Sequence, residues 1–293
     1  MIVRIRRRTL YLIAALMLII PVAIAADVSR SFNVLLTVGN NQPKIFQVIA
    51  PAATDPVENG TVTVYVLFNA TDPDGNNLDD TTAGAQIFLN GVYRLNSSRC
   101  NPVANYTNAS TDDSTQYNCS VTFLYYNNAS ASWQVNVTVA DINGNRTNDT
   151  GSSFTLNSLS AMRILDTSFD FGSVALGATA GAADNPFIIN NTGNFDFTWV
   201  NLTGYDLHGV SDRSYSIPAQ NFTVNVSANA IGLPLTNQTS VRLNAGPANN
   251  ATLYHGAPGG VANQSLWLYV VMPSAGIISQ QYNATAEWVL TVS

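Results

Sequence analysis

The sequence predicts an all-β protein with two β-sandwich domains in tandem behind an N-terminal export signal. Short segments alternate apolar and polar residues, Gly, Asn, Asp and Pro separate these segments, and none after the signal has a helical period. Removing a 25-residue signal from the 293-residue chain leaves 293 − 25 = 268 residues, which suggests two domains. We expect these domains at residues 27–158 and 160–293, with the boundary near 157–162.

The first 25 residues have the parts of a secretory signal peptide. A basic stretch precedes an apolar core at residues 10–20, and Pro21 and the small residues 23–25 follow it. The basic residues are Arg4, Arg6, Arg7 and Arg8. We expect cleavage after Ala25, which would leave no transmembrane segment in the mature chain. The alternative is an uncleaved membrane anchor at residues 9–26.

Three segments show the strand period most clearly: residues 61–70, 132–140 and 221–227. Their core-facing residues would be Val62, Val64, Val66 and Phe68, then Trp133, Val135, Val137 and Val139, then Phe222, Val224 and Val226. With those side chains inward, Asn136 and Asn225 are expected to face outward, as is Asn69, which follows the inward Phe68.

The expected mature chain is acidic and has few charged residues. Loss of four arginines leaves 12 − 4 = 8 basic residues against 18 acidic ones, a net charge of −10. Phosphate recognition needs clustered basic side chains, so a nucleic-acid partner is disfavoured. Charged residues make up only 10% of the whole sequence, so another group must keep the surface solvated.

N-glycans would supply that group, because acceptor motifs are abundant. With 34 Asn and 51 Ser plus Thr in 293 residues, random placement gives about 6 Asn-x-Ser/Thr motifs, whereas the chain has 18. They begin at Asn59, Asn69, Asn96, Asn105, Asn108, Asn118, Asn128, Asn136, Asn145, Asn148, Asn190, Asn201, Asn221, Asn225, Asn237, Asn250, Asn263 and Asn283. Crowded pairs, such as Asn145 with Asn148 and Asn105 with Asn108, are expected to carry one glycan each. The alternative is that polar strand surfaces simply favour Asn beside Thr.

The two cysteines, Cys100 and Cys119, are expected to form a disulfide, as an even cysteine count in an exported chain indicates. The bond would close a loop of about 20 residues, worth ~3 kcal/mol. A free thiol pair or a metal site is the alternative. We expect the bond to attach the long central connection to a strand starting at Ser120.

The sequence gives little indication of an enzyme. His208 and His255 are far apart in the sequence, and the two glutamates, Glu58 and Glu287, lie in different predicted domains. The Gly-rich stretch at 255–260 is typical of a hairpin rather than of an oxyanion loop. We therefore expect a protein without catalytic activity.

Calcium is the strongest candidate ligand. Two strand ends run into similar Asp/Asn-Gly-Asn turns, at residues 70–76 and 139–145, and supply hard oxygen ligands. The candidate ligands are Asp72, Asp74, Asn76, Asp79, Asp141 and Asn143. If both turns meet at one end of a sandwich, Asp72, Asp74 and Asp141 could share one ion. The alternative is ordinary tight turns with Asx hydrogen bonds.

Parts of the sequence resemble secreted immunoglobulin-like β-sandwich proteins of archaeal and bacterial envelopes. The ending VTVADINGN (137–145) resembles a penultimate-strand turn of such repeats, and NATDPDGNNLDD (69–80) is similar to a turn of polycystic-kidney-disease-type and cadherin-like domains. In the second half, FDFGSVALG (169–177) and IINNTGN (188–194) resemble the opening of hydin-type domains. The resemblance implies two immunoglobulin-like domains and a cell-surface setting.

The C-terminal segments resemble the closing hairpin of small secreted archaeal β-proteins. They are LWLYVVMP (266–273) and QYNATAEWVLTVS (281–293). We therefore expect these two segments to pair with each other.

The sequence favours a structural or adhesive cell-surface glycoprotein that assembles with itself or with other envelope proteins and glycans. The apolar, alternating segment at residues 30–38 could complete a sheet in a neighbouring copy, or it could be the first strand of its own domain. The competing function is a secreted module that binds carbohydrate or protein. Its stacking platforms would be drawn from Tyr125, Tyr126, Trp133, Trp199, Trp267 and Trp288, although tryptophans in alternating strands more often face a core.

Overall fold

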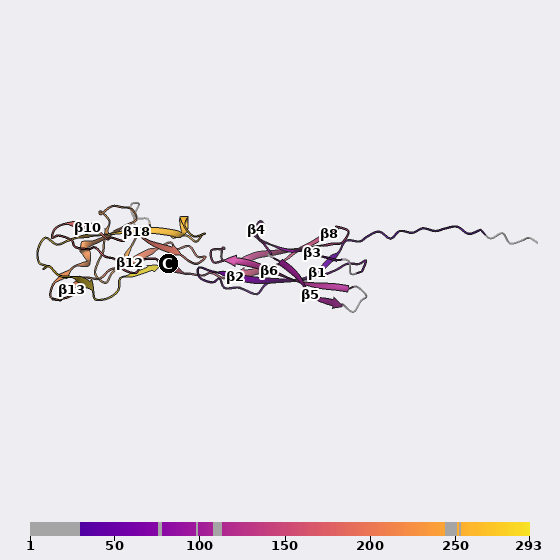
Figure 1. The fold of residues 1–293 in the computed structure, drawn as a ribbon, viewed down its shortest axis with the longest axis horizontal. Coiled ribbons are helices and arrows are strands. Elements are labelled where there is room, and N and C mark those ends of the chain that lie inside the picture. The colour runs from indigo at the N-terminus through magenta and orange to yellow at the C-terminus, as the bar shows by residue number, and fades with distance from the viewer. Residues whose placement is uncertain (1–29, 76–77, 98, 108–112, 244–250, 252) are drawn as a thin grey trace, which may run out of the picture. The chain divides into compact units, whose positions relative to one another are not determined.

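The computed structural model describes residues 30–75, 78–97, 99–107, 113–243, 251 and 253–293 (Figure 1). These residues form an all-β structure of several antiparallel sheets, as the sequence predicts. Their helices are two short 3-10 turns, η1 (Ala219–Asn221) and η2 (Gly260–Ala262), and neither is long enough to cross a membrane. Residues 40–293 form one compact unit, and residues 30–39 belong to a separate one. The expected signal peptide lies outside the described residues.

Two four-stranded antiparallel sheets make up the first part of the compact unit (Figure 1). One has the spatial order β1 (Lys44–Ile49), β2 (Thr61–Thr71), β6 (Asp113–Leu124) and β5 (Arg99–Thr107). The other has the order β4 (Val92–Asn96), β3 (Leu78–Leu89), β7 (Ser130–Asp141) and β8 (Arg146–Leu156). The strands predicted at 61–70 and 132–140 are therefore confirmed as β2 and β7, which lie in different sheets.

One hydrophobic core collects side chains from both of these sheets. Val64, Val66 and Phe68 alternate along β2 and are all buried. Trp133 of β7 is also buried and packs edge-on against Phe123 of β6, with ring centroids 5.0 Å apart. Full burial of a Val or Phe side chain stabilises a fold by about 1.5–3 kcal/mol. The alternating apolar residues of β2 therefore contribute strongly to this core.

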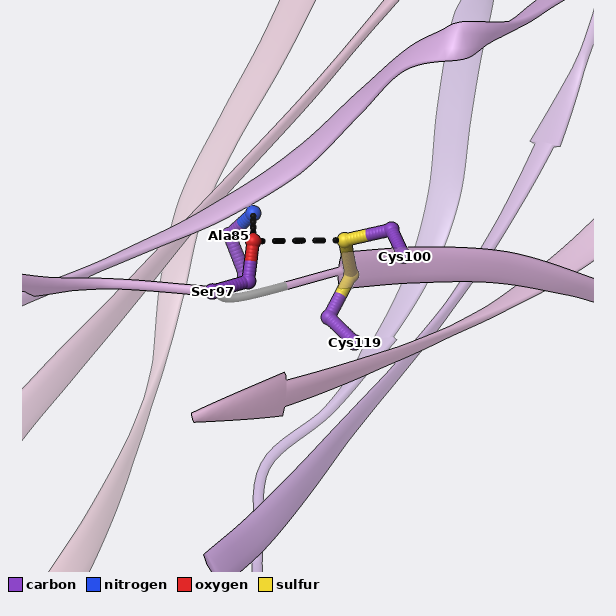
Figure 2. The surroundings of a disulfide bond; sticks show 4 residues. All are labelled: Ala85, Ser97, Cys100 and Cys119. Carbon is purple, nitrogen blue, oxygen red and sulfur yellow. Dashed lines mark hydrogen bonds between the residues drawn. A yellow bond between two sulfur atoms is a disulfide. The ribbon is translucent and has the colours of Figure 1, made fainter. Parts of the chain in front are cut away.

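A disulfide joins Cys100 of β5 to Cys119 of β6, which confirms the predicted pairing (Figure 2). The two residues are direct partners in the strand ladder. The expectation that the bond attaches a loop to a strand starting at Ser120 is wrong, because both cysteines lie inside neighbouring strands. Ser97 Oγ lies 3.5 Å from the Cys100 sulfur and accepts the N–H of Ala85 at 3.0 Å. Ser97 therefore links β3, through Ala85, to the disulfide.

Residues after 160 surround a second buried cluster, which includes Phe187, Phe222 and Leu268. Its largest sheet has the order β16 (Leu233–Pro234), β15 (Phe222–Asn225), β18 (Asn263–Val271), β11 (Phe187–Asn191) and β9 (Met162–Ile164), with β10 (Thr179–Gly181) also paired to β18. One three-stranded sheet has the order β17 (Ser240–Arg242), β12 (Val200–Thr203) and β20 (Val289–Val292). Another has the order β14 (Ser216–Ile217), β13 (Leu207–Gly209) and β19 (Tyr282–Ala284).

Two expectations about strands are wrong. The segments 266–273 and 281–293 do not form a closing hairpin, because β18 pairs with β11 and β15, while β19 pairs with β13 and β20 pairs with β12. Residues 30–38 are not the first strand of their own domain, since residues 30–43 contain no strand and β1 is the first strand of the described residues. The first error concerns pairing with segments distant in sequence, which local alternation does not specify.

Candidate functional site

Two asparagines that precede β1 link the two Asp-rich turns. Asn40 Nδ2 donates to Asp141 Oδ2 at 2.6 Å, at the end of β7. Asn41 Nδ2 donates to Asp74 Oδ1 at 2.6 Å, in the turn after β2, and its backbone N–H donates to the other oxygen of Asp74. The residues Asn40, Asn41, Asp72, Asp74, Asp141 and Asn143 are called the Asx cluster below.

Asp141 is the centre of its turn. Its Oδ1 accepts the backbone N–H groups of Asn143 and Asn145, both at 2.9 Å, and its Oδ2 accepts the side-chain N–H groups of Asn40 and Asn145. Desolvation by burial pushes the pKa of Asp141 upward, but the hydrogen bonds from Asn40, Asn145 and Asn143 outweigh it and lower the pKa below 3.8. The carboxylate thus stabilises the turn as an anion that accepts four N–H groups.

Asp72 is buried at the start of the other turn. Its Oδ1 accepts the backbone N–H of Asp74 at 2.9 Å, and its backbone carbonyl accepts the N–H of Gly75 at 3.2 Å. Its Oδ2 is buried and has no hydrogen-bond partner among the residues that the structure describes. Gly75 has a φ of 100°, which a residue with a Cβ rarely adopts, so this turn favours glycine at position 75.

Most carboxylate oxygens of the Asx cluster accept N–H groups, which a calcium ion would have to share or displace. Calcium needs six to eight oxygen ligands, but the oxygens of Asp74 and Asp141 already accept N–H groups, and Asp79 Oδ1 accepts both the N–H and the hydroxyl of Thr81. In the described part of the chain, no three His, Cys, Asp or Glu side chains are placed to hold a metal. Asn76 lies outside the described residues. Calcium binding stays a prediction.

A hollow of about 420 Å³ lies between β3 and β5, beside the disulfide, and is lined by Asp80, Thr81, Ala83, Ser97, Cys100, Asn101 and Pro102. Asp80 Oδ1 accepts the hydroxyl of Tyr117 at 2.7 Å. Burial, and then this hydrogen bond, raise the pKa of Tyr117 well above its ordinary value, so the phenol stays protonated and donates. The hollow therefore presents a carboxylate already engaged by a buried tyrosine.

The tryptophans divide between core and surface. Trp133 is fully buried and cannot stack on a ligand. Trp288 is half-buried and packs edge-on against Phe222. Trp199 is 46% exposed, but the Arg242 guanidinium covers one face of its ring at 3.8 Å from the centroid.

The predicted glycan acceptors occupy very different environments. Exposed ones are Asn59, Asn96, Asn128, Asn145, Asn148 and Asn283. Half-buried ones are Asn118, Asn136, Asn190, Asn201, Asn221, Asn237 and Asn263. The expectation that Asn69 and Asn225 face solvent is wrong, since they are only 1% and 4% exposed. The environments of the Asn105 side chain and of Asn108 and Asn250 fall outside what the structure describes.

The loop after β11 is the polar feature that the sequence did not single out as a site. Asn191, Thr192, Gly193 and Asn194 are all buried. Asn194 Nδ2 donates to the carbonyls of Asn127 and Asn157, both at 3.0 Å, and its Oδ1 accepts the N–H of Leu159 at 2.6 Å. A run of small polar residues directly after an alternating strand was the available signal.

The same loop is also bonded to the β1–β2 connection. Thr192 Oγ1 donates to Glu58 Oε1 at 2.8 Å, and the Thr192 carbonyl accepts the N–H of Asn59 at 3.0 Å. We call residues 191–194 with these partners the polar clamp. The polar clamp joins this loop, which lies beside the second core, to segments that flank strands of the first core: the β1–β2 connection, the β6–β7 connection and the residues after β8.

The chain is without recognisable relatives in two comparisons. No protein-family model matches it, and no curated protein matches it. Its function is therefore inferred from its own residues.

Proposed function

We propose that this chain is an exported, heavily N-glycosylated structural or adhesive protein of a cell surface, without catalytic activity, which assembles through its N-terminal segment. In this proposal a signal peptide at residues 1–25 is removed and two immunoglobulin-like sandwiches follow. The sheet orders β1-β2-β6-β5 and β4-β3-β7-β8 support the first of these domains, because they correspond to the A-B-E-D and C′-C-F-G orders of immunoglobulin-like folds.

The observation that carries the proposal is the exposure of residues 30–39. Phe32, Leu35 and Leu36 are 83%, 96% and 86% exposed, and Val34 and Val38 are similarly open. Burial of apolar surface is worth roughly 25 cal/mol per Å², so such a run in water favours association. Contiguous exposed apolar residues mark interaction sites.

In this proposal the partner of the segment is a second copy of the chain. Phe32, Val34, Leu36 and Val38 alternate with Asn33 and Thr37, so an extended segment would present one mostly apolar face. Strand addition satisfies the backbone of such a segment and buries alternate side chains. Donation from one copy to the next would then build a polymer.

Glycosylation and the disulfide fit the same setting. Disulfides persist in oxidising compartments, and Cys100–Cys119 is formed in this fold. Six predicted acceptors are exposed, and sugars there would supply the hydration that a 10% charged composition does not. One of these exposed acceptors, Asn59, lies in a turn between β1 and β2.

Deletion of residues 27–38 tests the assembly mechanism. Mature protein should sediment as polymer, and the deleted form should sediment as monomer with an unchanged melting temperature for the remaining fold. A sharper variant keeps the chain length and changes Phe32→Ser, Val34→Ser and Leu36→Ser. Its matched control changes Asn33→Ser and Thr37→Ser and should still assemble.

Either of two results would contradict the proposal. Polymers that persist after the deletion would show that another surface drives assembly. Monomers in the unaltered mature protein would favour the alternative function, a secreted module that binds carbohydrate or protein.

A further inference from the structure

The burial of the glycan acceptors divides them into two chemically different groups. Asn59, Asn128 and Asn148 are exposed, whereas Asn69 and Asn225 are almost fully buried. All five have the same acceptor motif, so the fold, not the motif, distinguishes them. The inference below rests on the proposed glycosylation and deepens it.

Asn69 is part of a row of carboxamides across one sheet. Its Nδ2 donates to Gln47 Oε1 of β1 at 2.8 Å, and its Oδ1 accepts Gln116 Nε2 of β6 at 3.0 Å. Asn69 is the ladder partner of both glutamines. Both polar atoms of the Asn69 side chain therefore form hydrogen bonds that link β1, β2 and β6. The residue is only 1% exposed.

Asn225 closes a local loop at the end of β15. Its Nδ2 donates to the carbonyls of Asn229 at 3.3 Å and Ile231 at 3.0 Å. Its Oδ1 accepts both the backbone N–H and the hydroxyl of Ser227, the motif's own hydroxyl residue. The acceptor amide and the Ser227 hydroxyl are thus both committed to the folded loop.

Three of the exposed acceptors lie at turns or at a strand end, and Asn148 and Asn283 lie within β8 and β19. Asn59 lies in the turn before β2, Asn96 is the last residue of β4, and Asn128 lies between β6 and β7. Of the crowded pair near β8, Asn145 Nδ2 donates to Asp141 Oδ2 at 3.2 Å, which assigns the single glycan of that pair to the exposed Asn148. Asn283 is exposed in β19.

We propose that the folded protein carries N-glycans at Asn59, Asn96, Asn128, Asn148 and Asn283, while Asn69 and Asn225 stay unmodified and serve as structural amides. N-glycosylation joins Nδ2 to the anomeric carbon of an oligosaccharide held on a lipid phosphate. The bond from that carbon to the phosphate oxygen breaks, the lipid phosphate leaves with the electron pair, and the amide loses one proton. A sugar on Asn69 would have to occupy the space of its neighbours, so modification there and this fold exclude each other.

Glycopeptide mass spectrometry of the folded, exported protein tests this assignment. The protein is first separated from misfolded material by size, and each peptide is then measured with and without its glycan. We expect glycan on the five proposed acceptors, Asn59, Asn96, Asn128, Asn148 and Asn283, and bare peptides at Asn69 and Asn225. Glycan on Asn69 or Asn225 in the folded pool would overturn the inference and leave the proposed surface function intact.

Two matched variants separate the acceptor from the structural amide. Asn148→Gln should remove the mass of one glycan and leave the melting temperature within about 1 °C, because an exposed side chain is exchanged. Asn69→Gln should remove no glycan mass but lower the melting temperature by on the order of 5 °C, because two buried hydrogen bonds are disturbed. Loss of a glycan in Asn69→Gln would contradict the inference. A chain with no glycan at any site would overturn the inference together with the glycoprotein assignment.

Discussion

The turn after β7 and the loop after β11 have similar sequences and opposite environments. DINGN at 141–145 and NNTGN at 190–194 both follow alternating strands. Residues 142–145 are exposed and surround one buried carboxylate, Asp141, whereas residues 191–194 are all buried in the polar clamp. The same residue types thus form a surface turn in one place and an internal clamp in the other.

The two glycines show why the difference arises. Gly144 has a φ of 88° and open space where a Cβ would lie, so its backbone conformation is what requires glycine. A Cβ on Gly193 would lie 2.1 Å from the carbonyl oxygen of Leu159, so close backbone approach requires glycine there. The sequence shows a glycine at both positions, but it does not show that one is required by a positive φ and the other by close packing against backbone.

The largest expected effect is that of Gly193→Ala. The added methyl meets backbone that cannot move without breaking the clamp, so we expect a loss of about 3 kcal/mol or more and a fall in Tm on the order of 6–12 °C. Thermal unfolding followed by circular dichroism measures it. The control is Gly144→Ala, where strain at positive φ alone should cost about 1–2 kcal/mol. Equal losses of unfolding free energy in Gly193→Ala and Gly144→Ala would contradict the claim that the two glycines are required for different reasons.

Asn194→Ala should cost slightly less. It leaves the carbonyls of Asn127 and Asn157 and the N–H of Leu159 without their side-chain partner. We expect a loss of about 2–3 kcal/mol in denaturant unfolding. An unchanged free energy of unfolding would mean that water replaces the amide and that the clamp contributes little.

Asp141→Asn should have a smaller, pH-dependent effect. Because folding lowers the pKa of Asp141, its carboxylate stabilises the protein above the unfolded value near 3.8, and this contribution is lost as pH falls through the lower folded value. The Tm of the unaltered protein should therefore exceed that of Asp141→Asn at pH 6, and the gap should narrow below about pH 4. A gap that is constant from pH 6 to pH 2 would contradict this explanation.

Calcium should have the smallest effect. Because the carboxylates of Asp74 and Asp141 already accept N–H groups, we expect millimolar calcium or a chelator to shift the Tm by less than about 1 °C. A rise of several degrees that Asp72→Asn or Asp141→Asn abolishes would establish the calcium site that the sequence suggested.

The sequence predicts the first half of the fold better than the second. Alternation in residues 61–70 and 132–140 is regular, so β2, β7 and the buried Trp133 were predictable. In the second half, strands of two to four residues are common, and β18, β19 and β20 pair with distant strands rather than with one another. Such pairing depends on long-range contacts that no local pattern encodes.

The candidate sites were predictable in position but not in environment. The sequence placed Asp74 and Asp141 in two similar turns, and in the structure Asn40 and Asn41 link these turns. The sequence did not predict that Asn69 is buried, because the burial of an outward-facing strand residue also depends on the side chains of the two neighbouring strands. Gln47 and Gln116 flank Asn69, and they become neighbours only when three strands pair.

Sedimentation velocity of the unaltered mature, glycosylated protein, with electron microscopy of the same sample, tests the proposed function most directly. Exposed apolar residues at 32–38 predict polymers at micromolar concentration, visible as filaments or sheets. A single monomeric species across the concentration range would contradict assembly through the N-terminal segment.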